Sequence, residues 1–423
     1  MNLGTVPLKI FNERHLRLIV WTLRIIVGLT FMMSGLVKAI DIFGFVFKIE
    51  EYLEVWQVAV PRSLTVMIAM IVSSTEFICG ALTVTGCFKR CAIYILAAMM
   101  VVMLPLTAYI WAMSPVSDCG CFGDFLKLSN AATFWKNVGL SLMVVYLIGF
   151  NRRVAGVYRP YVQWAVLVVG WTYITAVCLY GYNVQPLLDF RSFPAGSELV
   201  SDAGADDEQA VFEYIYSRDG ETRSFDIDNL PDSTWTFVDR KLVAGETADN
   251  LTVLSVRDMV GDDMTMEAIS EEGDELIVVI PQYDKADLAS TYVLNELQPF
   301  MEKHGGTMVA LIAAPAAKIT EWRDLSMTPI PVYTAEETTL KELVRGAIGL
   351  VYLHDGRILW KRALSAVDVE ALATGQITVE SYADRGEIIL TVMSLILAAM
   401  LALIAMADML RRSLSRRFFN HTK

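Results

Sequence analysis

Residues 91–113 read "CAIYILAAMMVVMLPLTAYIWAM", a run without a single charged side chain. A helix needs about 20 apolar residues to cross a hydrocarbon core of ~30 Å. The whole chain of 423 residues is 54 % apolar, with a mean hydropathy of +0.44. That composition is outside the range of a soluble protein and predicts a membrane protein. Five further stretches are long enough to span, at 18–40, 62–87, 131–150, 161–182 and 387–410.

The basic residues give these six spans an orientation. They gather near the N-terminus, between the second and third spans, between the fourth and fifth spans, and after the sixth. All four clusters fall on one side of the membrane if every span is real, so the positive-inside rule predicts that both termini face the cytoplasm. The clusters are Lys9, Arg14 and Arg17; Lys89 and Arg90; Arg152, Arg153 and Arg159; and Arg411, Arg412, Arg416, Arg417 and Lys423.

Three segments then face outward, at 41–61, 114–130 and 183–386. In the longest, acidic residues outnumber basic ones by more than two to one, although the whole chain has a net charge of only −12. We therefore predict a separate acidic soluble domain between the fifth and sixth spans.

The first part of this outer segment, 184–272, has β signals. "VFEYIYSRDGETRSFDI" (211–227) alternates apolar and polar residues around an Arg-Asp-Gly turn, which is typical of a hairpin. "STWTFVDRKLV" (233–243) favours another strand. We expect a β-rich segment here.

The second part, 273–385, has an α/β pattern that resembles the thioredoxin fold. Strands are expected at 275–280, 307–314 and 330–335, helices at 284–304, 319–325, 339–345 and 366–374, and a hairpin turns at 354–356. A thioredoxin has a Cys-x-x-Cys pair at the start of its first helix, but "PQYDKAD" (281–287) contains no cysteine. Ile348 stands where thioredoxins have a proline before the hairpin. We expect a binding or scaffolding module without thiol chemistry.

The loop after 91–113 carries a cysteine pair in "SDCGCFGD" (117–124). Gly120 permits the bend that brings Cys119 and Cys121 within disulfide reach, and an exposed, strained disulfide is suited to exchange. Outside the cytoplasm such a bond persists. Three other readings stay open: a constitutive disulfide turn, a pair that never oxidises, and a metal site. We expect no metal, because tetrahedral zinc needs four ligands and no second outward pair exists.

Four ionisable residues inside or beside the spans form a second set of candidates: Arg24, Lys38, Asp41 and Glu76. Buried charges in a membrane need partners, and we predict that Glu76 pairs with Arg24, either as a structural lock or in a proton relay. Lys38 and Asp41 are expected at the outer mouth. Lys38 either extends to the lipid headgroups or stabilises a cysteine thiolate or a quinone oxygen.

Four segments of the first half stand in an order that resembles the DoxX-like, MauE-type group of bacterial membrane proteins. The resemblance covers about 18–150 and implies a four-helix redox-associated bundle in a bacterial inner membrane, with the soluble domain in the periplasm. The segments are "RIIVGLTFMMSGLVKAID" (24–41), "GFVFKIEEY" (44–52), "STEFICGALTVTG" (74–86) and "DCGCFGDFLKLSNAATFWKN" (118–137).

The expected domains are the bundle at 1–160, the fifth helix at 161–183, the segments 184–272 and 273–385, and the sixth helix with a basic tail at 386–423. The leading hypothesis is a redox-associated protein that takes part in periplasmic thiol-disulfide exchange or maturation of an envelope protein through Cys119 and Cys121. If it is an enzyme, it is a thiol-disulfide oxidoreductase, with a quinone as one candidate electron acceptor. The alternative is a non-catalytic scaffold that docks an envelope complex. Membrane lipid is an expected partner and nucleic acid is not.

Overall fold

The computed structural model describes residues 13–114, 116, 119–126, 128–199, 211–218, 221–226, 236–244 and 254–421. It divides into two compact units. The membrane unit comprises 1–190 and 385–423, and the α/β unit comprises 191–384. The finer domain boundaries expected from the sequence stay a prediction.

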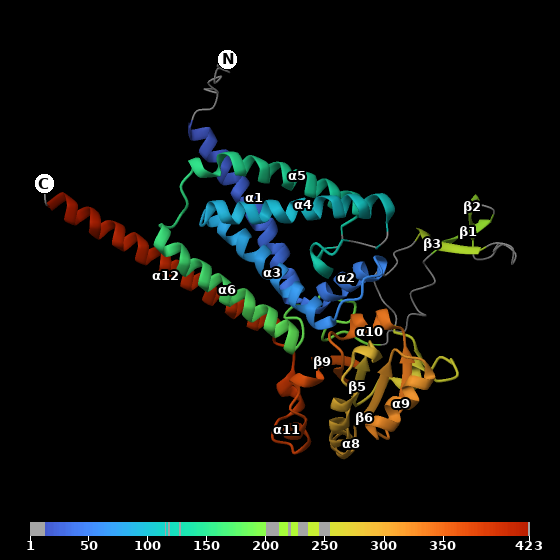
Figure 1. Ribbon diagram of the computed structural model, residues 1–423. Helices are drawn as coiled ribbons and strands as arrows, with labels where there is room; N and C mark the ends of the chain where they lie inside the picture. The colour runs from blue at the N-terminus through green and yellow to red at the C-terminus, as the bar shows by residue number, and fades with distance from the viewer. Residues whose placement is uncertain are drawn as a thin grey trace. The chain divides into compact units, whose positions relative to one another are not determined.

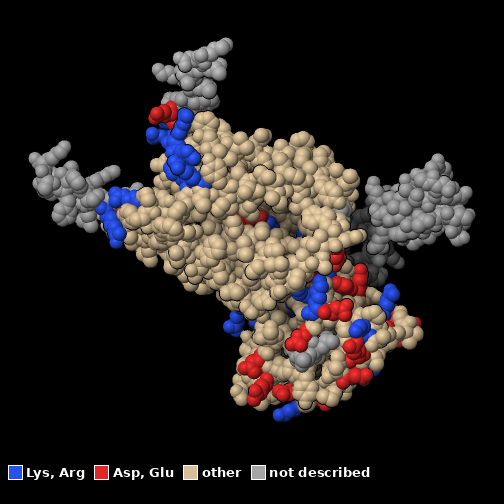
Figure 2. Space-filling model, viewed as in Figure 1, with Lys and Arg blue, Asp and Glu red and all other residues tan. Residues whose placement is uncertain are grey.

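Six helices of the membrane unit are long and apolar enough to span a bilayer, as the sequence predicts. Figure 2 shows an almost unbroken uncharged surface over these helices, with charged side chains gathered toward their ends. The chain is a multi-pass membrane protein. Its spanning helices are α1 (Glu13–Ile40), α3 (Arg62–Thr85), α4 (Lys89–Met113), α5 (Asn130–Phe150), α6 (Pro160–Asn183) and α12 (Gly386–His421).

The seventh helix of this unit, α2 (Ile42–Val55), lies in the segment that was expected only to face outward. It begins directly after α1, where the Asp41 carboxylate accepts a hydrogen bond from the Gly44 N–H at 2.9 Å. Asp41 is therefore the N-cap of α2. Figure 1 shows α2 beside one end of α1 and α3.

The spanning helices pack as a bundle in which α1 contacts α3, α4 contacts α5, and α6 contacts both α3 and α12. Figure 1 shows α12 lying along α6. Two side-chain hydrogen bonds join these last two helices, from Tyr161 to Asp408 and between Tyr173 and Ser394. Short 3₁₀ turns, η1 (Gly123–Phe125) and η2 (Asn151–Arg153), flank α5.

The α/β unit has a six-stranded sheet with the order β4-β7-β6-β5-β8-β9. The strands β5, β6 and β7 are parallel, whereas β8 and β9 form an antiparallel hairpin next to β5. The core order β6-β5-β8-β9 and its connections agree with the expected thioredoxin-like fold. The strands are β4 (Val256–Arg257), β5 (Asp274–Ile280), β6 (Thr307–Ile312), β7 (Val332–Ala335), β8 (Gly349–His354) and β9 (Arg357–Ala363).

Both faces of this sheet are covered, because successive side chains of β5 enter different cores. Leu276, Val278 and Ile280 pack with helices α8, α9 and α11, whereas Ile277 and Val279 pack with α10. Phe193, Leu199 and Leu254, which precede β5 in the chain, join the second core. The helices are α7 (Thr265–Ala268), α8 (Leu294–Lys303), α9 (Ala316–Ser326), α10 (Glu337–Leu343) and α11 (Val369–Ala373).

One expected helix of this unit is shorter than the sequence suggested. The stretch 284–304 is irregular at first and forms the 3₁₀ turns η5 (Tyr283–Lys285) and η6 (Leu288–Val293) before α8 begins. Two further short turns are η7 (Leu364–Ala366) and η8 (Val379–Tyr382). Ile348 stands directly before β8, at the position where the resemblance expects proline.

The expected hairpin in the β-rich segment is present. β1 (Val211–Arg218) pairs antiparallel with β2 (Glu221–Asp226), and β3 (Thr236–Ala244) pairs with the other edge of β1. These strands make a separate three-stranded sheet.

Candidate functional site: a disulfide beside a buried ion pair

Cys119 and Cys121 form a disulfide in the loop between α4 and α5. Their Cα atoms are 5.5 Å apart, within the range a disulfide requires. Gly120 makes the turn possible, since its φ is +65° and a Cβ there would lie 2.6 Å from Cγ of Lys48 on α2. The bend expected from the sequence is therefore present.

The disulfide is buried, which corrects the expectation of an exposed bond. Cys119 and Cys121 are only 8 % and 9 % exposed. They pack with apolar side chains from α2, α4 and the loop itself, namely Tyr52, Met103, Leu106, Ile110, Val116 and Phe122. A protein thiolate reaches these sulfur atoms only after the loop has moved.

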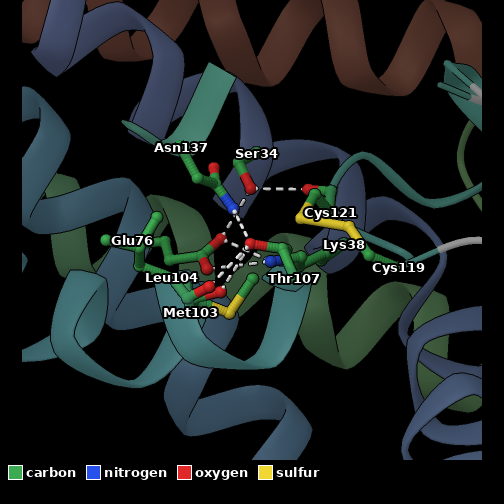
Figure 3. Close-up of a disulfide and its surroundings, with 9 residues drawn as sticks. All are labelled: Ser34, Lys38, Glu76, Met103, Leu104, Thr107, Cys119, Cys121 and Asn137. Carbon is green, nitrogen blue, oxygen red and sulfur yellow. Dashed lines mark hydrogen bonds and ion pairs between the residues drawn. A yellow bond between two sulfur atoms is a disulfide. The ribbon is translucent and has the colours of Figure 1, made fainter. Parts of the chain in front are cut away.

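Directly beside the disulfide lies a buried ion pair between Lys38 of α1 and Glu76 of α3. Lys38 Nζ is 2.8 Å from both carboxylate oxygens of Glu76, and each residue is 3 % exposed. The expectation that Lys38 extends to the headgroups is wrong, because a closer partner on the neighbouring helix holds its ammonium. Figure 3 shows the pair together with the disulfide.

Ser34 connects the ion pair to the cysteine loop. The single hydrogen of its Oγ is shared between Glu76 Oε2, at 2.8 Å, and the backbone carbonyl of Cys121, at 2.7 Å. Ser34 and Lys38 are four residues apart on α1 and so face α3 together. A continuous chain of three hydrogen bonds therefore runs from the Lys38 ammonium to Cys121 (Figure 3).

Polar groups on α4 and α5 lie near the same place. Asn137 Nδ2 donates to Thr107 Oγ1 at 3.3 Å, and both residues are buried. Lys136, one residue earlier on α5, is half-buried with its Nζ 4.5 Å from the centre of the Phe122 ring. Ser34 and Asn137 were not predicted from the sequence to belong to this site. Both lie in segments that carry the MauE-type resemblance, Ser34 in 24–41 and Asn137 in 118–137.

The predicted pair of Arg24 with Glu76 is wrong. Arg24 lies ten residues before Ser34, about 15 Å along α1 toward the other end of the bundle. There it is fully buried, and its guanidinium donates to Asn151 Oδ1 at 2.6 Å. It also donates to the backbone carbonyls of Asn151, Val154 and Ala155 at 2.9–3.0 Å. Arg24 therefore binds the connection after α5 and is no part of the site beside the disulfide.

The four remaining cysteines are free. Cys79 and Cys178 are buried in the spans, in keeping with a packing role, and Cys178 Sγ is 3.9 Å from Ser74 Oγ. Cys87 is also buried, between α3 and α4, and this burial raises the pKa of its thiol. Asp118 and Lys127, which flank the cysteine pair in the sequence, lie outside the described residues.

Comparisons with known proteins agree with the geometry in part. Residues 16–150 match the model of a family described as methylamine utilisation protein MauE, so the MauE resemblance is confirmed over that part of the chain. Residues 210–244 match a domain of unknown function (DUF8463). No curated protein matches the chain.

One solved structure is similar, that of the bacterioferritin comigratory protein of Xanthomonas campestris, whose description concerns alkyl peroxide reduction. The identity is 16 %, the match covers 36 % of this chain and 90 % of that chain, and the TM-score is 0.22.

Proposed function

We propose that this protein is a redox-associated protein of the bacterial inner membrane that exchanges disulfides with an envelope client through Cys119 and Cys121. The observation that carries the proposal is the disulfide itself, held beside buried charges in a membrane bundle that matches the MauE family model. Buried ionisable groups in a span are costly, at about 2.5–3.5 kcal/mol each on insertion scales, and so are typical of functional sites.

The chemistry begins with a client dithiol. Its thiolate attacks one sulfur of the pair, a mixed disulfide forms, and the second client thiol then releases an oxidised client and a reduced Cys119–Cys121 pair. Reoxidation needs an acceptor of two electrons and two protons. We propose a quinone for this step, because the described cysteines outside the pair are all free and form no second disulfide.

The proposed orientation has both termini in the cytoplasm and the α/β unit in the periplasm. It is supported by the four clusters of basic residues, which all fall on one side of six spans. A membrane-impermeant maleimide added to intact spheroplasts tests it. A cysteine placed at Val260, which is 85 % exposed in the α/β unit, should be labelled, and the exposed Cys91 should not. The opposite pattern would reverse the orientation.

Trapping experiments test the exchange. With Cys119→Ala or Cys121→Ala, the remaining thiol should hold clients as mixed disulfides in cells, seen on non-reducing gels and identified by mass spectrometry. Cys178→Ala is the matched control, since that thiol is buried in α6 and should not affect trapping. If neither single variant captures a client, the exchange proposal fails.

A second candidate is a non-catalytic scaffold that docks an envelope complex through the α/β unit. The burial of the disulfide favours it, since a sealed bond is suited to a constitutive structural role. The acidic surface visible in Figure 2 would then be the docking surface. Unchanged complex composition in the Cys119→Ala/Cys121→Ala double variant, together with no trapped client, would support this candidate.

A further inference from the structure

The charges beside the disulfide do not cancel. Lys38 and Glu76 neutralise each other, and Lys136 of α5 brings a second amine to the loop, with its Nζ 4.5 Å from the centre of the ring of Phe122, the residue after Cys121. With Lys136 protonated, two positive charges and one negative charge surround a bond whose opening creates a thiolate. A thiolate there would make the group neutral, and a nearby cation favours the charged form of a thiol.

The contacts also distinguish the two cysteines. Ser34 donates a hydrogen bond to the backbone carbonyl of Cys121. Figure 3 shows Cys121 on the side of Ser34 and Cys119 on the far side of the disulfide. The residue tied to the charge cluster is therefore Cys121.

We propose that Cys121 is the leaving sulfur of the exchange and that the Lys38–Glu76–Lys136 cluster stabilises its thiolate. The inference rests on the exchange function proposed above. A client thiolate bonds to Cys119 Sγ, the bond between the two cysteines breaks, and its electron pair stays on Cys121 Sγ. Lys136 and Lys38 supply the positive charge. Glu76 and Ser34 are positioning residues, because Glu76 holds the Lys38 ammonium and Ser34 holds the cysteine loop.

Other charged groups around the loop are already paired or lie elsewhere. On α2, Lys48 and Glu51 pair with each other at 2.7 Å, while the Lys48 side chain passes over Gly120. Asp124 in η1 has an interaction of its own. The effect of the cluster on Cys121 therefore depends on the two ammonium groups outweighing Glu76.

The test measures the thiol of Cys121 directly and needs no client. In purified full-length Cys119→Ala, the rate of alkylation of Cys121 by iodoacetamide is followed against pH by mass spectrometry. We expect its midpoint to lie at least about one pH unit below the ordinary thiol value of about 8.5. In Cys121→Ala, the midpoint for Cys119 should stay near the ordinary value.

Charge variants in the Cys119→Ala background show whether the cluster is the cause. Lys136→Met should raise the Cys121 midpoint by about one pH unit, Lys136→Arg should leave it unchanged, and Glu76→Gln should not raise it. Lys136 is half-buried, so its replacement is less of a risk to folding than that of Lys38. A purely structural role would not reproduce this dependence on charge.

A Cys121 midpoint at or above the ordinary value, equal midpoints for the two cysteines, or no response to Lys136→Met would each overturn the inference. The trapping experiment is independent of these results. If the Cys121 midpoint is low and depends on Lys136 but no client is trapped, the stabilised thiolate is supported and the exchange function is rejected. If clients are trapped but the midpoint is ordinary, the exchange function is supported and the stabilised thiolate is rejected.

Discussion

Gly28 of α1 and Gly80 of α3 approach each other so closely that neither position has room for a side chain. A Cβ on Gly28 would lie 2.8 Å from the Gly80 carbonyl oxygen, and a Cβ on Gly80 would lie 2.6 Å from that of Gly28. Such small-residue contacts let the backbones of membrane helices pack directly. This contact brings Ser34 and Lys38, further along α1, against Glu76.

Gly80→Ala should therefore destabilise the bundle by about 1–3 kcal/mol, the usual cost of overpacking, because backbone and not a flexible side chain blocks the new methyl group. The measurement is the thermal midpoint of the purified protein in detergent. Gly139→Ala in α5 is the control, since nothing lies within 4 Å of its Cβ position. Equal midpoints for the two variants would contradict the α1–α3 contact.

Arg24 should not tolerate replacement even by lysine. Its guanidinium donates to three backbone carbonyls and to the Asn151 side chain at once. A lysine ammonium has a single nitrogen and cannot donate to all of these acceptors in the same geometry. We expect Arg24→Lys to cost about 1–3 kcal/mol through carbonyls left unpaired. Arg17→Lys, near the start of the same helix, is the control. The rate of amide hydrogen exchange at 151–155 should rise in Arg24→Lys but not in Arg17→Lys. If these amides stay protected in Arg24→Lys, the contact between Arg24 and this segment is ruled out.

The buried pair of Lys38 and Glu76 predicts strong coupling. Removing one partner by Lys38→Met leaves an uncompensated carboxylate and should cost about 3–5 kcal/mol, whereas Lys38→Met/Glu76→Met should restore much of the loss. A double-mutant cycle on thermal stability gives the coupling energy. If the two single losses simply add in the double variant, the pair does not exist in the membrane. Stability and activity both unchanged in Glu76→Gln would likewise exclude a structural lock and a relay.

His354 gives the α/β unit a pH dependence of known sign. Its Nδ1 hydrogen bond to Asp274, 2.7 Å long, raises the pKa of the imidazole, and the Asp355 carboxylate adds to the effect. A raised folded-state pKa means that the interaction stabilises the fold fully below about pH 6.5 and that this stability is lost as the pH rises through the folded-state pKa.

An NMR titration of the His354 ring in the full chain should show a midpoint above that of an unfolded peptide. Asp274→Asn should lower the midpoint more than Asp355→Asn does, because the Asp274 hydrogen bond is the larger cause. A midpoint unmoved by Asp274→Asn would contradict this assignment.

The sequence predicted the spans well because hydropathy over about 20 residues is a strong, local signal. It also predicted the hairpin of β1 and β2 and the α/β pattern, since both depend on local periodicity. The partner of Glu76 could not be predicted in this way. Arg24, Ser34 and Lys38 all lie on α1, and only the packing of α1 on α3 decides which of them meets Glu76.

The burial of the disulfide could not be predicted from the sequence either. The order "CGC" permits the bend, but α2 and α4 cover the sulfur atoms, and α2 lies far from the loop in sequence. A helix of that length cannot span the membrane, so hydropathy alone did not distinguish it from a loop.

The carbonyls that hold Arg24 also impose an order on biogenesis. All of them lie 127–131 residues later in the chain, so a nascent first helix enters the bilayer with a cation that has no counterpart yet synthesised. We expect that helix to keep its guanidinium among the headgroups until the ribosome has delivered α5 and the residues after it. Closure of the bundle is then expected after insertion of the fourth spanning helix.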